Sequence, residues 1–433
     1  MLVPLSQAVA GTCGGKAGAL GVLLRAGLPV PDGFVVPFVV PFAGGAGEAD
    51  EADELDALTR ALARLGDPPV AVRSSAAGED TGRASAAGQH ESFLAVRGAG
   101  EVAEAVHACR ASLFTPRAVA YRGAFGDAAP MMAVIVQRQV DAEASGVMFT
   151  PAEPGGVTDI EASWGLGPTV VGGTVTPDAY RVAADGTVAR TVADKRTRLD
   201  RHGGRLVTRE VPEPSRTRPA LDDATALRLA ELGGEIAAVL GGPQDIEFAI
   251  AGDRIWILQS RPITAPPPPP ARSLPAHPSP AANGGGAVGG PGTVNGEGAA
   301  NDHAIVNDQG AADDPGIANK PGAVNGPEVV LAGTPGSRGA ATGVARIVRG
   351  PADFGRVRPG DILVCPFTDP AWTPLLRVAA GVVTEIGGVL SHAAIVAREH
   401  GIPAVLGVAD ATVRLDDGAP VTVDGATGTV TTR

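Results

Sequence analysis

The residue whose type and position most clearly suggest chemistry is His392, which follows the turn Gly387-Gly388. The glycines permit a tight turn, Ser391 is a good N-cap, and Ala393–His400 favour a helix that ends at Gly401. His392 is therefore expected in the first turn of that helix, where free N–H groups and the helix dipole stabilise an anion. A neutral imidazole is a nucleophile near pH 7. These features predict that His392 can accept and carry a phosphoryl group.

Two N-terminal segments could contact phosphate. Lys16 closes a Gly-Gly-Lys turn before a helix to Arg25, which would offer backbone N–H groups and a mobile ammonium. This short motif also occurs in ordinary solvated loops, and it lacks the spacing of a Walker A loop. Arg73 ends the apolar run Val70–Val72, so a strand would deliver its guanidinium.

A third group of polar residues lies on two alternating strands near residue 250. If their loop has three residues, Asp245 pairs opposite Gln259, and Asp245, Glu247, Gln259 and Arg261 share one face. A two-residue loop would move Gln259 to the other face. The first register gathers oxygen ligands and a guanidinium, which suits Mg²⁺ bridging phosphates. The alternative is a solvated sheet face.

The composition divides the chain into three parts, two of which would supply the elements that position these residues. Residues 1–264 and 331–433 alternate strand-like and helix-like segments, whereas residues 265–330 are rich in Pro, Gly, Ala and Asn. The middle part cannot bury enough apolar surface to offset its ordering entropy, so it is predicted to be a flexible linker. It is either a spacer or a tether that lets one domain travel.

The net charge, the cysteines and the apolar runs of the chain limit which partners and which cellular compartment are expected. The formal net charge of the 433 residues is −12, which argues against nucleic acid and anionic membranes as partners. Three separated cysteines fit reduced thiols better than a disulfide framework. No signal peptide or membrane-length apolar run is evident. These features predict a soluble cytoplasmic protein.

The segment around His392 resembles the phosphohistidine motif of the PEP-utilising mobile domain. Pyruvate phosphate dikinases, phosphoenolpyruvate synthases and rifampicin phosphotransferases share that domain. The resemblance extends over nearly all of residues 331–433, including Gly336–Ala345, Pro359–Pro366 and the strand around Val423. It implies that His392 is the phosphorylated, catalytic residue. Leu390 departs from the dikinase and synthase pattern, where a Thr open to regulatory phosphorylation is typical.

Most of residues 1–264 resembles the ATP-grasp-like nucleotide domain of the same enzymes. Matching segments include Ala111–Arg117, Ser145–Thr150 and Ser163–Gly167. The resemblance implies that ATP or magnesium is contacted by Lys16, Arg73, Arg117, Glu247, Gln259 and Arg261. Of these, Glu247 and Gln259 are the predicted Mg²⁺ ligands.

The resemblance implies an α/β and α+β multidomain protein. An ATP-grasp-like nucleotide-binding domain at 1–264 would be followed by a disordered linker at 265–330. A small β/α swivelling phosphohistidine domain would occupy 331–433. The implied activity moves a phosphoryl group, the β-phosphate of ATP, to His392, and releases AMP and phosphate.

The sequence leaves the phosphoryl acceptor open, because no acceptor domain is visible in it. A small molecule or a partner acceptor subunit, as in a split phosphoenolpyruvate synthase, would receive the group. One alternative is a complete small antibiotic phosphotransferase of the rifampicin type. An alternative of another class is a non-catalytic nucleotide-binding or regulatory protein.

Overall fold

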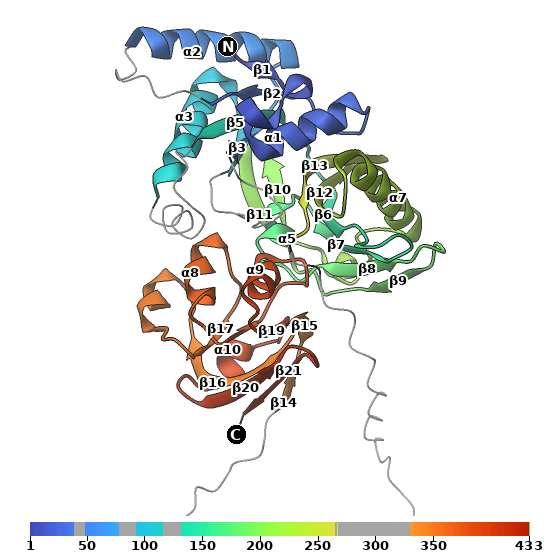
Figure 1. The fold of residues 1–433 in the computed structure, drawn as a ribbon, viewed down its shortest axis with the longest axis vertical. Helices are drawn as coiled ribbons and strands as arrows, with labels where there is room; N and C mark the ends of the chain where they lie inside the picture. The colour runs from blue at the N-terminus through green and yellow to red at the C-terminus, as the bar shows by residue number, and fades with distance from the viewer. Residues whose placement is uncertain (39–47, 78–91, 116–130, 265, 267–329, 433) are drawn as a thin grey trace, which may run out of the picture. The chain divides into compact units, whose positions relative to one another are not determined.

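The computed structural model describes residues 1–38, 48–77, 92–115, 131–264, 266 and 330–432 (Figure 1). These residues form a mixed α/β structure with three larger sheets and a two-stranded arm. The predicted linker at 265–330 lies almost entirely outside the described residues, and so does Arg117. Every described helix is too short or too polar to serve as a membrane span.

The first sheet is antiparallel and has five strands. Their order in the sheet is β1 (Val3–Pro4), β2 (Gly33–Val36), β5 (Met132–Arg138), β3 (Val70–Ala76) and β4 (Ser92–Val96). Three helices pack near it: α1 (Ala10–Arg25), α2 (Glu48–Leu65) and α3 (Gly98–Ala111). Six of the seven residues of β3 are buried, and Arg73 is the exception that reaches partial exposure. The strand thus delivers a guanidinium from an otherwise buried backbone, as the sequence predicted.

The second sheet is antiparallel and has six strands. Their order is β13 (Arg254–Pro262), β12 (Gln244–Ala251), β6 (Ala144–Phe149), β7 (Thr158–Trp164), β8 (Asp178–Val182) and β9 (Val188–Thr191). Helix α7 (Asp223–Leu240) packs along one face, with Asp222 capping its start and Gly241 in the left-handed conformation at its end (Figure 1). One hydrophobic cluster joins Leu20 of α1 to Met148 of β6 and Leu229 of α7, so the two sheets share a core.

Short elements complete the N-terminal part of the chain. They are η1 (Leu5–Gln7), η2 (Ser112–Phe114), α5 (Pro168–Val171), the arm of β10 (Thr197–His202) and β11 (Arg205–Glu210), and α6 (Glu213–Arg216). Helix α5 lies between β7 and β8 in the chain and contacts β6 and β7.

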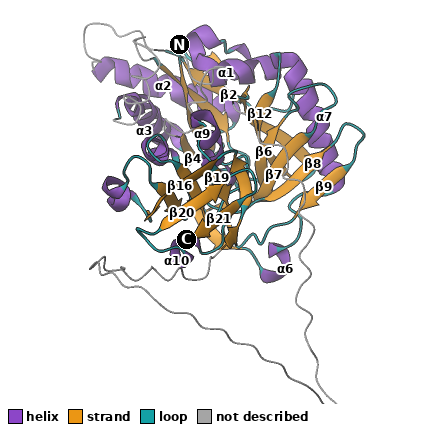
Figure 2. Ribbon diagram, turned by 60° about the horizontal axis from the view of Figure 1, so that its bottom comes forward, coloured by secondary structure: helices purple, strands orange, loops and turns teal. Residues whose placement is uncertain are grey.

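The third sheet is mixed and has eight strands (Figure 2). Their order is β14 (Val330–Ala332), β21 (Thr429–Thr432), β20 (Pro420–Asp424), β16 (Ala340–Ile347), β17 (Ile362–Cys365), β18 (Gly381–Thr384), β19 (Ala404–Leu406) and β15 (Thr334–Ser337). The four strands β16 to β19 pair in parallel. The connecting helices are η3 (Pro351–Arg356), η4 (Pro370–Trp372), α8 (Thr373–Leu376), α9 (His392–His400) and α10 (Ala411–Arg414). The carboxyl ends of β17 and β18 therefore meet at one edge, where α8 and α9 begin.

The β12–β13 hairpin differs from its predicted register. Strand β12 continues to Ala251, which leaves a loop of two residues instead of three. The predicted pairing of Asp245 with Gln259 is therefore wrong. Asp245 pairs with Arg261, and Glu247 pairs with Gln259.

A β-bulge nevertheless keeps the predicted set of side chains on one face. The register shifts between Glu247 and Phe248, and Leu258 is the extra residue on the partner strand. An extra residue reverses the facing of every side chain beyond it. The bulge therefore cancels the effect of the short loop and returns Gln259 to the face that carries Glu247.

One buried ion pair lies at the start of β8 in the second sheet. Lys195 and Asp178 are both fully buried, with Lys195 Nζ 2.5 Å from Asp178 Oδ1. Asp178 also accepts the N–H groups of Ala193 and Ala220, and the hydroxyl of Tyr180 donates to it. A buried charge with this many partners is tolerated only while all of them remain.

We expect Lys195→Met to lower the free energy of unfolding by about 3–5 kcal/mol, because Asp178 would be left as an uncompensated buried charge. Urea unfolding followed by circular dichroism measures the change. Arg196→Met is the matched control, since Arg196 is exposed and its ion pair with Asp194 contributes little. Equal unfolding midpoints for Lys195→Met and wild type would contradict a structural role for this pair.

Candidate functional site

A cavity of about 320 Å³ lies among residues contributed by both N-terminal sheets and by α1 and α5. Its polar lining includes Lys16, Arg73, Glu247, Gln259 and Arg261. The apolar lining includes Ala71, Leu94, Val140, Leu166 and Leu258. The cavity therefore combines a surface for a flat apolar group with cationic side chains for an anion: Lys16, Arg73, Arg138 and Arg261. Five of the six predicted nucleotide-contacting residues line it, and the sixth, Arg117, lies outside the described residues.

The guanidinium of Arg73 connects the two sheets at this cavity. Its Nη1 donates to the carbonyl of Leu258 at 2.6 Å. Its Nη2 donates to Glu247 Oε2 at 2.9 Å and to Gln259 Oε1 at 2.7 Å. The planar fork of arginine satisfies all three acceptors, which a lysine ammonium on a flexible stem would not do in the same geometry.

A second guanidinium at the cavity, that of Arg261, is oriented by Asp245. Arg261 donates to Asp245 Oδ2 through Nε at 2.8 Å and through Nη2 at 2.7 Å. Burial raises the pKa of Asp245, and the neighbouring Arg261 and Arg398 only partly oppose that shift. Since both members of the pair are buried, the carboxylate fixes the direction of Arg261 while the guanidinium still lines the cavity.

Lys16 reaches the cavity because helix α1 is kinked at Gly14. The helix begins at Ala10, before the Gly-Gly-Lys segment, so the predicted turn is a kink inside a helix. Gly14 has φ +79°, and a Cβ there would lie 2.2 Å from the carbonyl oxygen of Ser75. The N–H of Ala17 donates to Ser75 Oγ at 3.1 Å. Only glycine fits this close approach, which holds the Lys16 segment against the end of β3.

His392 is the first residue of α9 and is only 4% exposed. Ser391 precedes the helix in extended conformation, as predicted for an N-cap, but its hydroxyl makes no capping hydrogen bond. The ring lies between two hydroxyls: Nδ1 is 3.0 Å from Thr368 Oγ1, and Nε2 is 3.3 Å from Thr373 Oγ1.

The hydrogen bonds assign the tautomer of His392. Thr373 donates its hydroxyl proton to the carbonyl of Pro370 at 3.0 Å, so Nε2–H donates to Thr373 Oγ1. The Nδ1 lone pair then accepts from the hydroxyl of Thr368. A ring nitrogen must exchange one of these hydroxyls for a phosphorus atom before it can react.

Sequence reasoning missed Thr368 and Thr373, although a signal was available. Both follow β17, and His392 follows the neighbouring parallel strand β18. Loops at the carboxyl ends of adjacent parallel strands meet. Polar residues in the loop after β17 were therefore candidates to contact the imidazole.

The oxygen ligands near the cavity do not form a complete metal cage. The described residues contain no group of three or more His, Cys, Asp or Glu side chains arranged to hold a metal ion. Glu247 and Gln259 lie directly opposite each other on β12 and β13. Two protein oxygens fit Mg²⁺ where phosphate oxygens and water complete its six ligands.

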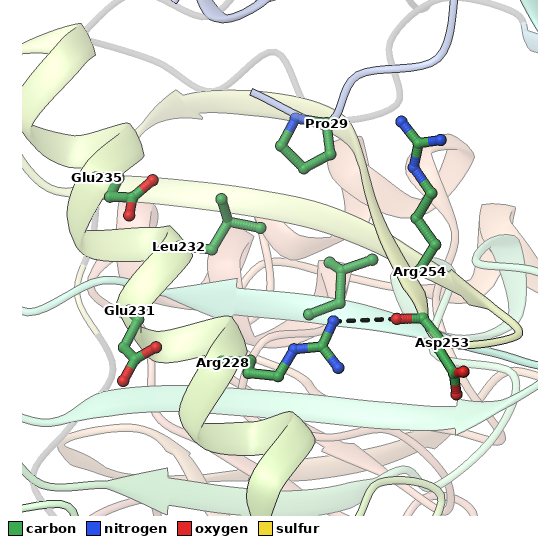
Figure 3. Close-up of a pocket in the computed structure, with 8 residues that line it drawn as sticks. Pro29, Arg228, Glu231, Leu232, Glu235, Asp253 and Arg254 are labelled. Carbon is green, nitrogen blue, oxygen red and sulfur yellow. Dashed lines mark hydrogen bonds between the residues drawn. The ribbon is translucent and has the colours of Figure 1, made fainter. Parts of the chain in front are cut away.

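A second, more open pocket of about 520 Å³ has a different character (Figure 3). Its lining residues are Pro29, Arg228, Glu231, Leu232, Glu235, Asp253, Arg254 and Ile255. Arg228 points to the carbonyl of Asp253, which accepts from Nη2 at 3.0 Å. Three carboxylates and two guanidinium groups suit an anion less well than the smaller cavity. The cavity that contains Arg73 is therefore the better candidate for a nucleotide site.

Comparisons with known proteins agree with the motifs. Residues 51–274 match a family model described as the pyruvate phosphate dikinase AMP/ATP-binding domain. Residues 357–428 match one described as the mobile domain of PEP-utilising enzymes. The chain thus carries an ATP-binding domain, and the resemblance expected from the sequence is confirmed.

Similar curated proteins are named phosphoenolpyruvate synthases. A probable one from Methanothermobacter thermautotrophicus is 35% identical over 468 residues, covering 97% of this chain and 61% of that protein. Another from Archaeoglobus fulgidus is 35% identical, covering 96% of this chain and 56% of that protein. The Escherichia coli protein is 33% identical and covers 83% and 42%. The chain therefore spans between 42% and 61% of the length of these relatives.

We expect Arg73→Lys to weaken ATP binding by about tenfold or more, since charge-assisted hydrogen bonds made by the planar fork would be lost. Isothermal titration calorimetry measures the dissociation constant. Arg190→Lys is the matched control, because Arg190 makes an exposed ion pair with Asp223. Wild-type affinity in Arg73→Lys would show that the nucleotide binds elsewhere.

Proposed function

We propose that this chain, which belongs to the family of the pyruvate phosphate dikinase AMP/ATP-binding domain, transfers a phosphoryl group from ATP to His392 and then to an acceptor. The observation that carries the proposal is a combination of two sites in one chain. One is a cavity lined by Lys16, Arg73 and Arg261 beside apolar side chains. The other is an imidazole at the first position of a helix, with both ring nitrogens held by hydroxyls.

In this proposal the apolar lining takes the adenine, and the cationic side chains take the phosphates. Arg73 and Arg261 are already oriented by Glu247, Gln259 and Asp245, so little side-chain entropy is lost when the anion binds. Arg117 is proposed as a further phosphate contact from the family resemblance. The proposed fold of residues 1–264 is ATP-grasp-like, which the family match supports.

Glu247 and Gln259 are the proposed protein ligands of Mg²⁺. The metal would neutralise charge on the phosphates as the bond to phosphorus changes. Arg73 shares both ligand side chains, so it would stay beside the metal and interact with the same phosphates.

The proposed reaction balances with one water molecule. A ring nitrogen of His392 forms a bond to the β-phosphorus, and the bond from that phosphorus to the α,β-bridging oxygen breaks, which releases AMP. Water then cleaves the β,γ bridge and releases phosphate. The β-phosphoryl group remains on His392, at the N-terminal end of α9, where it is stabilised as an anion.

The proposed domain organisation accounts for the separation of the two sites. The described lining of the nucleotide cavity comes from residues 16–261 and does not include His392. We propose that the domain at 331–433 swivels on the linker at 265–330, so that His392 visits the nucleotide domain at 1–264 and then the acceptor.

The names of the relatives make pyruvate the first acceptor to test, either bound by a partner acceptor subunit or held by this chain. An antibiotic or other small hydroxyl compound is the second, by analogy with rifampicin phosphotransferases. The proposed compartment is the cytoplasm, with neither nucleic acid nor membrane as a partner.

We expect ATP labelled at the β-phosphorus to leave acid-labile label on the chain, with one AMP released per label. ATP labelled at the γ-phosphorus should leave none, since that group departs as phosphate. Filter binding after rapid acid-free quenching measures the β-label and the γ-label retained on the chain.

His392→Gln is the variant that should abolish the label while retaining ATP affinity, and His400→Gln is its control on the exposed end of the same helix. Retention of γ-label, or β-label that survives His392→Gln, would overturn the proposed reaction. ATP binding without any label or AMP would favour the non-catalytic alternative.

Removal of Mg²⁺ with EDTA should abolish labelling. Glu247→Gln should raise the Mg²⁺ concentration needed for half-maximal labelling by about tenfold or more, because one anionic ligand is lost. Glu143→Gln is the control, since Glu143 is an exposed carboxylate in the loop directly before β6. Labelling at full rate in EDTA would contradict a metal-dependent transfer.

A further inference from the structure

Glu161 on β7 is a buried carboxylate that the proposed chemistry does not use. It is 3% exposed, and its two oxygens accept backbone N–H groups from a distant part of the chain. Oε1 accepts from Val389 at 2.6 Å, and Oε2 accepts from Leu390 at 3.1 Å. Both partners lie in the loop directly before His392. All these residues belong to one compact unit, which comprises Met1–Pro270 and Glu328–Arg433.

The second sheet aligns Glu161 with the candidate nucleotide site. Glu161 pairs with Val147 of β6, and Val147 pairs with Glu247 of β12. Directly opposed residues point to the same face of a sheet, and adjacent strands lie about 4.8 Å apart. Glu161 is therefore only about 10 Å along the sheet from the proposed metal ligand Glu247.

Helix α5 separates the nucleotide cavity from the His392 loop and touches both. Pro168 and Val171 line the cavity. Val170 between them packs in one buried cluster with Leu390 and Ile395 of the C-terminal part. The loop before His392 therefore rests on the wall of the nucleotide cavity.

Gly388 permits the close approach of this loop to Glu161. A Cβ at position 388 would lie 2.2 Å from Glu161 Oε1 and 2.3 Å from Oε2, and its three nearest heavy atoms all belong to Glu161. The φ angle of Gly388 is outside the left-handed region, so its own backbone would accept alanine without strain. The requirement for glycine thus comes from the contact with Glu161.

The charges around this contact are only partly compensated. Arg398 donates to the carbonyl of Val389 at 2.7 Å and to that of Gly336 at 2.9 Å, and it is the cation that acts on Glu161. Burial raises the pKa of Glu161 to about 7, while the two N–H groups and Arg398 oppose the shift and Asp159 adds to it. The hydrogen bonds and the nearby cation do not fully offset the desolvation cost of this carboxylate. Such a contact can open again.

We infer that Glu161 is a positioning residue that docks the His392 loop on the nucleotide domain for phosphoryl loading. The inference rests on the proposed function. It identifies Glu161 as part of the surface on which the swivelling domain would be held. Glu161 acts through the backbone of Val389 and Leu390 and does not touch the reacting atoms. Gly388 is the matching residue on the loop, because its lack of a side chain lets the loop approach Glu161.

The experiment is a double-mutant cycle between positions 161 and 388 in the full chain. The first measurement is the single-turnover rate of β-label transfer from ATP to His392. Gly388→Ala should slow this rate by about tenfold or more, while the ATP dissociation constant stays within about twofold of wild type. Adding Gly388→Ala to Glu161→Ala should change the rate by less than about twofold, because the clashing carboxylate is gone.

Two controls separate docking from folding. Gly355→Ala is the matched glycine variant, since a Cβ there has open space and should leave the rate unchanged. Glu161→Gln keeps the shape of the side chain and one acceptor, so its rate should lie between wild type and Glu161→Ala. A Gly388→Ala rate equal to wild type, or independent effects of the two substitutions, would overturn the inference.

Hydrogen exchange provides a readout that does not require activity. The amides of Val389 and Leu390 should exchange at least about tenfold faster in Glu161→Ala than in wild type, because they lose their acceptor. Unchanged protection would overturn the docking contact. If wild type takes no label, the proposed function fails while hydrogen exchange still tests the contact. If wild type takes label and the variants match it in rate and protection, the docking inference alone fails.

Discussion

The pleat of the second sheet is the constraint on which the rest of the site depends, because it decides which side chains share a face. Asp245 and Glu247 lie on β12 opposite Arg261 and Gln259, and the β-bulge at Leu258 is needed to keep that arrangement. The carbonyl of Leu258 accepts from Arg73, so the guanidinium that joins the two sheets also contacts the bulge. The same face continues through Val147 to Glu161. One sheet surface therefore carries the proposed metal ligands, an oriented guanidinium and the docking carboxylate.

The proposed nucleotide site and the loop before His392 are held by contacts of different strength. The Asp245–Arg261 pair is buried, and two nitrogens of Arg261 contact the same oxygen of Asp245, which restricts the orientation of the guanidinium. Glu161 is buried against two N–H groups, but desolvation still raises its pKa to about 7. His392 is covered by Thr368 and Thr373, which belong to the same proposed domain and would move with it. In the proposed mechanism the incompletely compensated contact at Glu161 suits a domain that must leave again, whereas the arginines of the proposed nucleotide cavity are already oriented.

Local sequence rules predicted the elements whose geometry is local. Glycines and helix formers placed His392 at the start of α9, and an apolar run placed Arg73 on a strand. The register of the β12–β13 hairpin was predicted wrongly, because the loop has two residues instead of three and a bulge follows it. That bulge contacts a residue from another sheet, Arg73, so it has no short-range signature. The kink at Gly14 likewise depends on Ser75, which lies 61 positions away in the chain. Glu161 shares its strand with Thr158, Asp159 and Ser163, so its residue type alone did not distinguish it. Its partners lie more than 220 residues further along the chain.

The most direct test of the proposed phosphotransfer is to locate the phosphoryl group on the chain. Full-length protein would be incubated with Mg²⁺ and ATP, digested at neutral to basic pH, and mapped by tandem mass spectrometry that preserves phosphoramidate bonds. The proposed mechanism predicts one phosphoryl group on His392 and AMP in equal amount. A phosphoryl group on a different residue, or an unmodified His392 in protein that binds ATP and releases AMP, would contradict it.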